Sequence, residues 1–302
     1  MMEEGPRDRL EVLADEERRR KMLRRQRARR RILRSTAVLP ALCTVLNGLS
    51  GFAAIHFATK DALGSASMMN LTIGAWMVAA AMLFDMLDGR LARLTRRTSD
   101  FGAQLDSLSD AISFGVAPAV LMLRAIITTM REYVNHLTME RVVWCVAGVY
   151  VACALLRLAR FNVETERDES AHMEFSGLPS PGAAALVAAM VALIGDLQGR
   201  EWTPKNVLYP AASVALPLVT LAVALLMVSR FRYPHVMNKY FRGRRPFNFL
   251  VAVVLLVLAA IMELILTGAI VAMVFALFGP VDALVRKLRK PAEQHVPPPS
   301  PI

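Results

Sequence analysis

Long apolar stretches separated by shorter polar segments dominate the chain from residue 37 onward. A helix needs about 20 predominantly apolar residues to cross the hydrocarbon core of a bilayer. Within lipid, every backbone polar group must also find its partner inside the protein, which a helix achieves. The pattern therefore predicts an all-α fold, a polytopic integral membrane helical bundle. Six candidate membrane helices run over 37–57, 67–87, 103–127, 141–158, from about 181 to 194, and 207–228.

A further apolar stretch, 249–279, is ambiguous because it is about 30 residues long. It fits either one overlong helix or two short helices that turn near 263–268. Two helices would raise the total to about eight and would place both termini on the same side of the membrane.

The distribution of charge favours the count of eight. The chain has 302 residues, is 55% hydrophobic and has a formal net charge of +11. With eight helices, 30 of the 36 Lys and Arg residues fall on one side of the membrane. Cytoplasmic loops of membrane proteins are enriched in Lys and Arg, so we expect both termini to be cytoplasmic.

The same pattern divides the chain into three parts. Residues 1–36 form a polar tail with 13 Lys and Arg against 7 Asp and Glu, residues 37–280 form the membrane domain, and residues 281–302 form a Pro-rich cytoplasmic tail. The basic tail is expected to set orientation or to lie on anionic lipid headgroups as an interfacial helix. A nucleic-acid-binding arm is the rival interpretation, and we predict no nucleic-acid partner.

Cysteine and histidine do not indicate a metal or redox site. The three cysteines, Cys43, Cys145 and Cys153, lie in apolar segments without a CxxC pair. They are typical of small buried apolar side chains. The five histidines are scattered and show no metal-ligand spacing.

Four aspartates lie beside the ends of two apolar stretches. Asp85 and Asp88 (i, i+3) share one helix face, as do Asp106 and Asp110 (i, i+4). A short turn near 95–101 would fold the two helices antiparallel and bring the carboxylates together. Acidic groups at membrane depth are costly and usually functional. Converging carboxylates need cations, and Mg²⁺ or Mn²⁺ prefer oxygen ligands.

The surrounding residues suit phosphate chemistry. Metal ions among carboxylates neutralise charge that develops on phosphate oxygens. Gly89 and Ala92 keep one wall of the site small, and Arg93 offers a planar donor fork for phosphate. Thr44 and Asn47 share a face of the first stretch; they line the same cavity or join helices by polar packing.

This spacing resembles a known signature. The chain reads Asp85-x2-Asp88-Gly89-x2-Ala92-Arg93-x8-Gly102-x3-Asp106-x3-Asp110. It resembles the CDP-alcohol phosphatidyltransferases at all eight fixed positions. Members of that family join a CDP-linked lipid to an alcohol and release CMP. The resemblance implies two divalent ions, Mg²⁺ or Mn²⁺, and a homodimer.

The resemblance also assigns roles. It implies that Asp85, Asp88 and Asp106 hold the metals and that Asp110 is the general base, while also touching a metal. A general base must lie within hydrogen-bond reach of the proton it removes. The nucleotide-binding or phosphate-binding positions implied are Gly89, Ala92, Arg93, Gly102, Thr44 and Asn47.

The text around the signature resembles one branch, the bacterial-type phosphatidylserine synthases. The matching segments are FDMLDGRLARLTRRTSDFGAQLDSLSDAISFGVAPA, LLRLARFNV, FSGLPSP and LMVSRFRYP, within 39–234. The glycerol-phosphate branch has Pro where Ser107 stands and Lys where Ala111 stands. Ser109 departs from the Ala expected in the serine branch. The branch implies CDP-diacylglycerol and L-serine as substrates.

An acceptor with a carboxylate requires a cation nearby. Arg157 and Arg160 (i, i+3) end the fourth stretch, with Asn162 beside them and Ser113 in the third. We expect these four residues to bind the serine carboxylate or the lipid phosphate. Snorkelling of the arginines to the membrane edge is the alternative. The segment 177–181 is expected to start a helix.

Three other functions remain open at this point. A sibling enzyme would use glycerol phosphate, inositol phosphate or choline as acceptor. An ion-coupled transporter would use the acidic groups as an ion path, although no matching acidic half follows later. A structural tether with a nucleic-acid-binding tail is the third. For the enzyme, we expect the bacterial inner membrane, with the active site facing the cytosol.

Overall fold

The computed structural model describes residues 39–60, 65–95, 100–130, 136–167, 177–231, 233 and 259–289. Within these ranges all regular structure is helical, so the predicted all-α fold is confirmed. The helices are a first, unlabelled helix Leu39–Thr59, α2 Ser65–Thr95, α3 Asp100–Asp110, the π-helix η1 Ala111–Val116, α4 Ala117–Met130, α5 His136–Arg167, α6 Ser180–Gly199, α7 Lys205–Val228 and α10 Leu264–Arg289.

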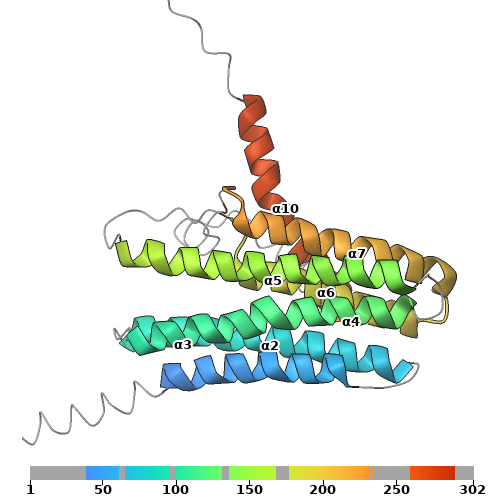
Figure 1. The fold of residues 1–302 in the computed structure, drawn as a ribbon, viewed down its shortest axis with the longest axis horizontal. Helices are drawn as coiled ribbons and strands as arrows, with labels where there is room; N and C mark the ends of the chain where they lie inside the picture. The colour runs from blue at the N-terminus through green and yellow to red at the C-terminus, as the bar shows by residue number, and fades with distance from the viewer. Residues whose placement is uncertain are drawn as a thin grey trace, which may run out of the picture.

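The long helices lie side by side and reverse direction from one to the next (Figure 1). Helix α6 is central, because it packs against α2, α4, α7 and α10. Its small and branched side chains Ala183, Leu186 and Val187 are buried in the core. Helix α4 is the second central element and packs against α2, α5, α6 and α7.

Seven of the described helices are long and apolar enough to cross a membrane, and we treat the chain as an integral membrane protein. Six of them coincide with the six predicted stretches, and the seventh is α10. Most ends lie within about five residues of the predicted position, but α2 extends to Thr95 and α5 extends to Arg167.

The ends of the helices bear on the predicted count of eight. We call the end of the bundle that holds Asp85 and Asp106 the acidic end. Helix α7 finishes there, because Leu178 and Gly177, which precede α6, donate to backbone carbonyls of Leu226 and Phe231. Glu263 lies at the opposite end.

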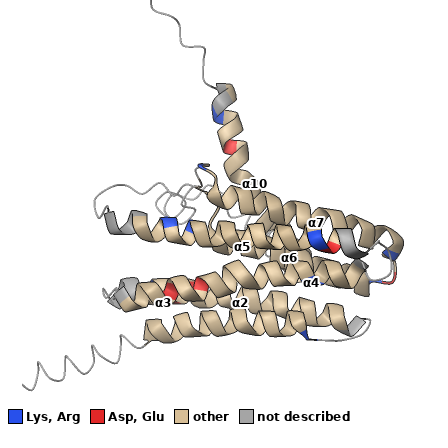
Figure 2. Ribbon diagram, viewed as in Figure 1, with Lys and Arg blue, Asp and Glu red and all other residues tan. Residues whose placement is uncertain are grey.

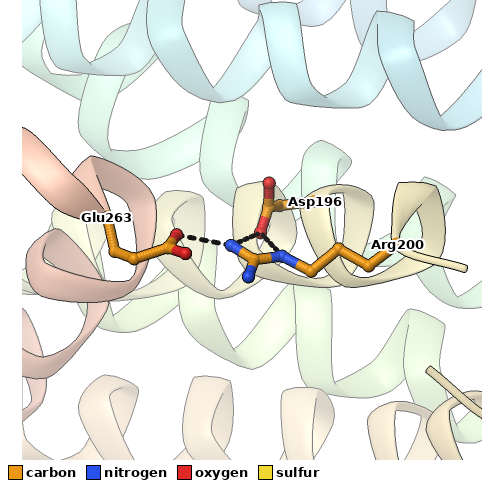
Figure 3. A network of polar contacts seen from close by, with 3 residues as sticks. All are labelled: Asp196, Arg200 and Glu263. Atoms are coloured by element: carbon orange, nitrogen blue, oxygen red, sulfur yellow. Dashed lines mark hydrogen bonds and ion pairs between the residues drawn. The ribbon is translucent and has the colours of Figure 1, made fainter. Parts of the chain in front are cut away.

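Figure 3 shows this opposite end, where Glu263 and Asp196 both contact Arg200, just beyond α6. Between residues 233 and 263 the chain therefore passes from the acidic end to the opposite end, as a count of eight requires. Residues 249–258, about the first third of the ambiguous stretch, lie outside the described part. The side of the membrane that each end faces stays a prediction.

The third apolar stretch is less regular than the single helix predicted for 103–127. It consists of α3, the π-helix η1 and α4. Pro118 explains the break: in an α-helix it would have to donate to the Phe114 carbonyl, and proline has no N–H. The buried Tyr150 hydroxyl of α5 donates to that carbonyl instead, at 3.1 Å.

Helix α10 repeats this arrangement near its end. Pro280 cannot donate to the Ala276 carbonyl, and the Tyr233 hydroxyl donates to it at 2.9 Å. A Cβ on Gly279 would lie 2.7 Å from Cε2 of the Tyr233 ring, so only glycine admits the ring here. Beyond this point the end of α10, drawn in red, projects away from the bundle (Figure 1). The predicted domain boundary at residue 280 falls inside this helix and stays a prediction; residues 1–36 lie outside the described part.

Candidate active site and metal centre

Three carboxylates converge at the acidic end. Asp85 and Asp88 share a face of α2, and Asp106 projects from α3, which runs back antiparallel to it. One oxygen from each of the three lies within 4.8 Å of the others. The predicted convergence of the two helix ends therefore forms a compact acidic cluster, which we call the acidic pocket without implying a cavity.

The residues fit a divalent metal ion. Asp88 is only 6% exposed. Asp88 Oδ2 and Asp106 Oδ1 are both buried and accept no hydrogen bond from any described residue. A buried carboxylate oxygen without a partner is unfavourable unless a cation compensates its charge. An all-oxygen donor set is the one that Mg²⁺ and Mn²⁺ prefer.

Asp110 lies one helical turn beyond Asp106, outside the set of three oxygens. Asn47 of the first helix donates from Nδ2 to Asp110 Oδ1 at 2.9 Å. Asp110 also directly precedes η1, and π turns are frequent at functional sites. The structure thus brings three of the four predicted ligands together, while the fourth is oriented by an amide group.

The first helix packs very closely on this region. A Cβ on Gly48 would lie 3.2 Å from Ser109 Oγ, and one on Gly51 would lie 2.6 Å from Ser113 Cα. The buried Ser113 hydroxyl donates to the Asn47 carbonyl at 2.8 Å. These glycines were not among the predicted site residues. Their i, i+3 spacing beside Asn47 was the available signal, but close approach depends on a partner helix.

Thr44 and Asn47, predicted to line the cavity, do face the aspartates. Thr44 is 5% exposed; its hydroxyl contacts the Asp88 carboxylate and donates to the Pro40 carbonyl at 3.1 Å. Asn47 is fully buried, and its Oδ1 has no hydrogen-bond partner among the described residues. Both side chains therefore belong to the wall of the acidic pocket.

Space is open on the predicted nucleotide-binding side. A Cβ on Gly89 would meet no described atom within 4 Å. Gly102 is half-buried in the first turn of α3. The side chains of Ala92 and Arg93 lie outside the described part, and the binding roles of all four residues stay predictions.

The predicted acceptor residues separate into two groups. Arg157 donates from Nη1 to Ser180 Oγ at 3.1 Å, and its buried Nε has no partner among the described residues. It also interacts electrostatically with Asp110. Asn162 instead donates from Nδ2 to Ser107 Oγ of α3 at 3.0 Å. Arg160 is exposed on the same helix.

Local sequence explains how Arg157 meets Ser180. Gly177 has φ +93°, and the segment after it is fixed to the end of α7 by the backbone bonds described above. Pro179 is the N-cap residue of α6, so the helix starts at Ser180, as predicted for 177–181. Figure 2 shows acidic residues on α3 and basic residues on α5 near this same end of the bundle.

A comparison with known protein families covers both the membrane helices and the aspartate motif. The family model of the CDP-alcohol phosphatidyltransferases matches residues 37–216, more than half of the chain. The chain belongs to the CDP-alcohol phosphatidyltransferase family. The matched residues include the first helix, all four aspartates and the Arg157–Ser180 contact, so the predicted resemblance is confirmed.

Curated relatives bear names from one branch of the family. A "CDP-diacylglycerol--serine O-phosphatidyltransferase" of Mycobacterium tuberculosis is 34% identical over 60% of this chain and 58% of its own length. One of Helicobacter pylori with the same name is 35% identical over 56% of this chain and 64% of its own length. An "Archaetidylserine synthase" of Methanothermobacter thermautotrophicus is 36% identical over 67% of this chain and 72% of its own length. The chain thus spans less than two thirds of the length of the first two relatives.

Proposed function

We propose that this family member is a CDP-diacylglycerol–serine O-phosphatidyltransferase, which makes phosphatidylserine and CMP from CDP-diacylglycerol and L-serine. The observation that supports it most is the set of three converging carboxylates at the end of two membrane helices, with Asp110 beside it. The names of the curated relatives support serine as the acceptor.

Asp85, Asp88 and Asp106 would hold one or two divalent ions, Mg²⁺ or Mn²⁺. Bound there, the ions would neutralise negative charge on the diphosphate of CDP-diacylglycerol. The fit rests on the two buried oxygens without partners, Asp88 Oδ2 and Asp106 Oδ1. Gly89, Ala92, Arg93 and Gly102 would receive the nucleotide and its phosphates on the adjoining wall.

Asp110 would act as the general base and as a further metal ligand. It removes the proton of the serine hydroxyl, whose oxygen then forms a bond to the phosphorus of the lipid phosphate. The bond from that phosphorus to the oxygen bridging to CMP breaks, and CMP leaves with the electron pair. The hydrogen bond from Asn47 fixes the orientation of the carboxylate for this transfer.

Arg157 would bind the carboxylate of L-serine. Its Nε is buried and without a partner among the described residues, while Nη1 donates to Ser180, so the guanidinium is oriented and its Nε–H is available to a ligand. An arginine fork suits a carboxylate. Arg160, Asn162 and Ser113 are secondary candidates, since the described bonds of Asn162 and Ser113 join helices.

For the intact protein we propose a homodimer in the bacterial inner membrane, with the acidic end facing the cytosol. The excess of Lys and Arg in segments predicted at that end supports this orientation.

The deciding experiment identifies the lipid product made from labelled L-serine. Membranes or nanodiscs containing the protein receive CDP-diacylglycerol, Mn²⁺ or Mg²⁺, and a panel of serine, glycerol phosphate, inositol phosphate and choline. We expect labelled phosphatidylserine and stoichiometric CMP, which chelation of the metal abolishes. CMP release with another acceptor alone would reassign the enzyme within the family, and no CMP with any acceptor would reject the proposal.

A further inference from the structure

The last described segment, 281–289, leaves the bundle at its acidic end. Gly279 packs against Tyr233, which follows α7, and Pro280 comes next. Figure 1 shows that the end of α10 then runs across the direction of the other helices. Proline within a helix is a well-known cause of such kinks. If the bundle helices cross a membrane, this segment lies along the membrane plane.

The segment is amphipathic. Val281, Leu284, Val285 and Leu288 recur at i, i+3, i+4 and i+7, which places them on one face of the helix. The side chains of Leu284 and Leu288 are 57% and 76% exposed, respectively. The bundle therefore does not cover this apolar face in the described part of the chain.

The charges identify what fits this face. Asp282 pairs with Arg286 across one turn at 2.8 Å. The sequence then adds Lys287, Arg289 and Lys290, so basic residues exceed acidic ones by three in 281–290. A short helix with an apolar face and a cationic remainder suits the boundary between headgroups and acyl chains. Anionic headgroups attract each nearby Lys or Arg.

We propose that 281–289 is an interfacial helix that binds the anionic lipid leaflet at the acidic end. The bend is built into the fold, because the Tyr233 hydroxyl takes the Ala276 carbonyl that Pro280 leaves without a donor. The missing Cβ at Gly279 admits the Tyr233 ring. The helix thus holds anionic lipid at the end of the bundle that carries the three carboxylates. The proposal depends on membrane insertion and not on which alcohol the enzyme uses.

The test uses the full-length protein with its native cysteines replaced by alanine and one environment-sensitive fluorophore. The label is placed by Leu284→Cys on the apolar face or by Ala283→Cys on the other face, two changes that leave every charge in place. The variants are reconstituted in phosphatidylcholine vesicles with or without phosphatidylglycerol. Brominated acyl chains quench from the lipid side, and iodide quenches from water.

We expect the label at 284 to be quenched severalfold more by brominated lipid than by iodide, with the reverse order at 283. Phosphatidylglycerol should increase the contrast, and high salt should reduce it. Equal iodide quenching at both positions would overturn the proposal, because the segment would then lie in water. Protection of position 284 from both quenchers would also overturn it, because protein would then cover the face.

A second variant tests the origin of the bend. Tyr233→Phe removes the donor to the Ala276 carbonyl but keeps the ring against Gly279. We expect it to lower the contrast between positions 284 and 283 severalfold, and unchanged contrast would remove Tyr233 from the proposal. If this variant does not fold, the labels at positions 283 and 284 in the protein that keeps Tyr233 still decide whether the helix binds the leaflet.

Discussion

The Asn47 Nδ2 donates to the Asp110 carboxylate at 2.9 Å, which orients the carboxylate for the proposed role as general base. We predict that Asp110→Asn lowers kcat by about 100-fold to 10,000-fold, the usual contribution of a general base. The fold should remain intact, because an amide oxygen still accepts from Asn47. CMP release measures the loss, and thermal unfolding in detergent checks the fold. Turnover near that of the wild type would contradict the role assigned to Asp110.

Gly51 has no side chain, and this lets the first helix pack closely against η1 beside the site. A Cβ there would lie 2.6 Å from Ser113 Cα, so Gly51→Ala must push the first helix away from η1. We predict a loss of about 1–3 kcal/mol in the free energy of unfolding, together with lower activity, because Asn47 moves with the helix.

The matched control is Gly148→Ala on α5, where a Cβ meets no described atom within 4 Å. Alanine favours a helix over glycine by about 1 kcal/mol, so this change should be neutral or stabilising. Equal effects of the two changes in a denaturation series would show that close approach at Gly51 has no special importance.

At this scale the sequence predicted the aspartates well and their surroundings poorly. The spacing of Asp85 and Asp88, and that of Asp106 and Asp110, fixes which side chains share a helix face, and that is a local property. The packing of Gly51 against Ser113 depends on a helix elsewhere in the chain. The bond from Asn162 to Ser107 likewise joins α5 to α3, and no local pattern specifies it.

The proline-tyrosine pair of Pro118 and Tyr150 decides the shape of the third membrane helix. Tyr150→Phe would leave the buried Phe114 carbonyl without this donor. An unsatisfied buried polar group costs about 1–3 kcal/mol, and we predict a destabilisation of that size. Chemical denaturation in mild detergent would measure it.

A double-mutant cycle provides the control for this prediction. Pro118→Ala restores a backbone N–H that can bond the Phe114 carbonyl, so Tyr150→Phe should cost less in that background than in the wild type. Additive effects of the two changes would contradict the pairing of this hydroxyl with the proline.

At the scale of whole helices, length and apolar composition were sufficient to predict the membrane segments. The π turn was missed, although Pro118 was visible in the sequence, because proline in a membrane helix has several outcomes. Neighbouring side chains decide among them, and here the neighbour is Tyr150 on α5. A π turn holds one residue more than an α-helical turn, and one residue corresponds to a rotation of about 100°. The side chains of α3 and α4 therefore face different neighbouring helices.

Across the whole molecule, the contacts of Arg200 fix α10 to α6 at the end opposite the acidic pocket (Figure 3). The hydrogen bond from Arg200 holds the pKa of the Glu263 carboxyl below its usual range, and the two carboxylates raise the pKa of Arg200. The stabilisation is therefore complete above the unfolded pKa of glutamate, about 4.3. It is lost as the pH falls through the lower folded pKa.

We predict that Glu263→Gln lowers Tm slightly at neutral pH and that the difference from the wild type disappears in strong acid. The effect should be small and should shrink in salt, because the Arg200 and Glu263 side chains are partly exposed to solvent. Glu201→Gln, at an exposed neighbouring position, is the charge-matched control. A difference that grows on acidification would contradict the sign of the pKa shift.

The interior of α4 beyond η1 has a consequence for the membrane itself. Leu121, Met122 and Ile126 are fully or almost fully buried there, and Val187 and Val191 of α6, which packs against α4, are also buried. The three converging carboxylates thus lie at one end of the bundle, and these apolar side chains fill the core beyond them. We expect this apolar layer to block the passage of protons and ions, so proteoliposomes that contain the protein should keep their electrical potential during turnover.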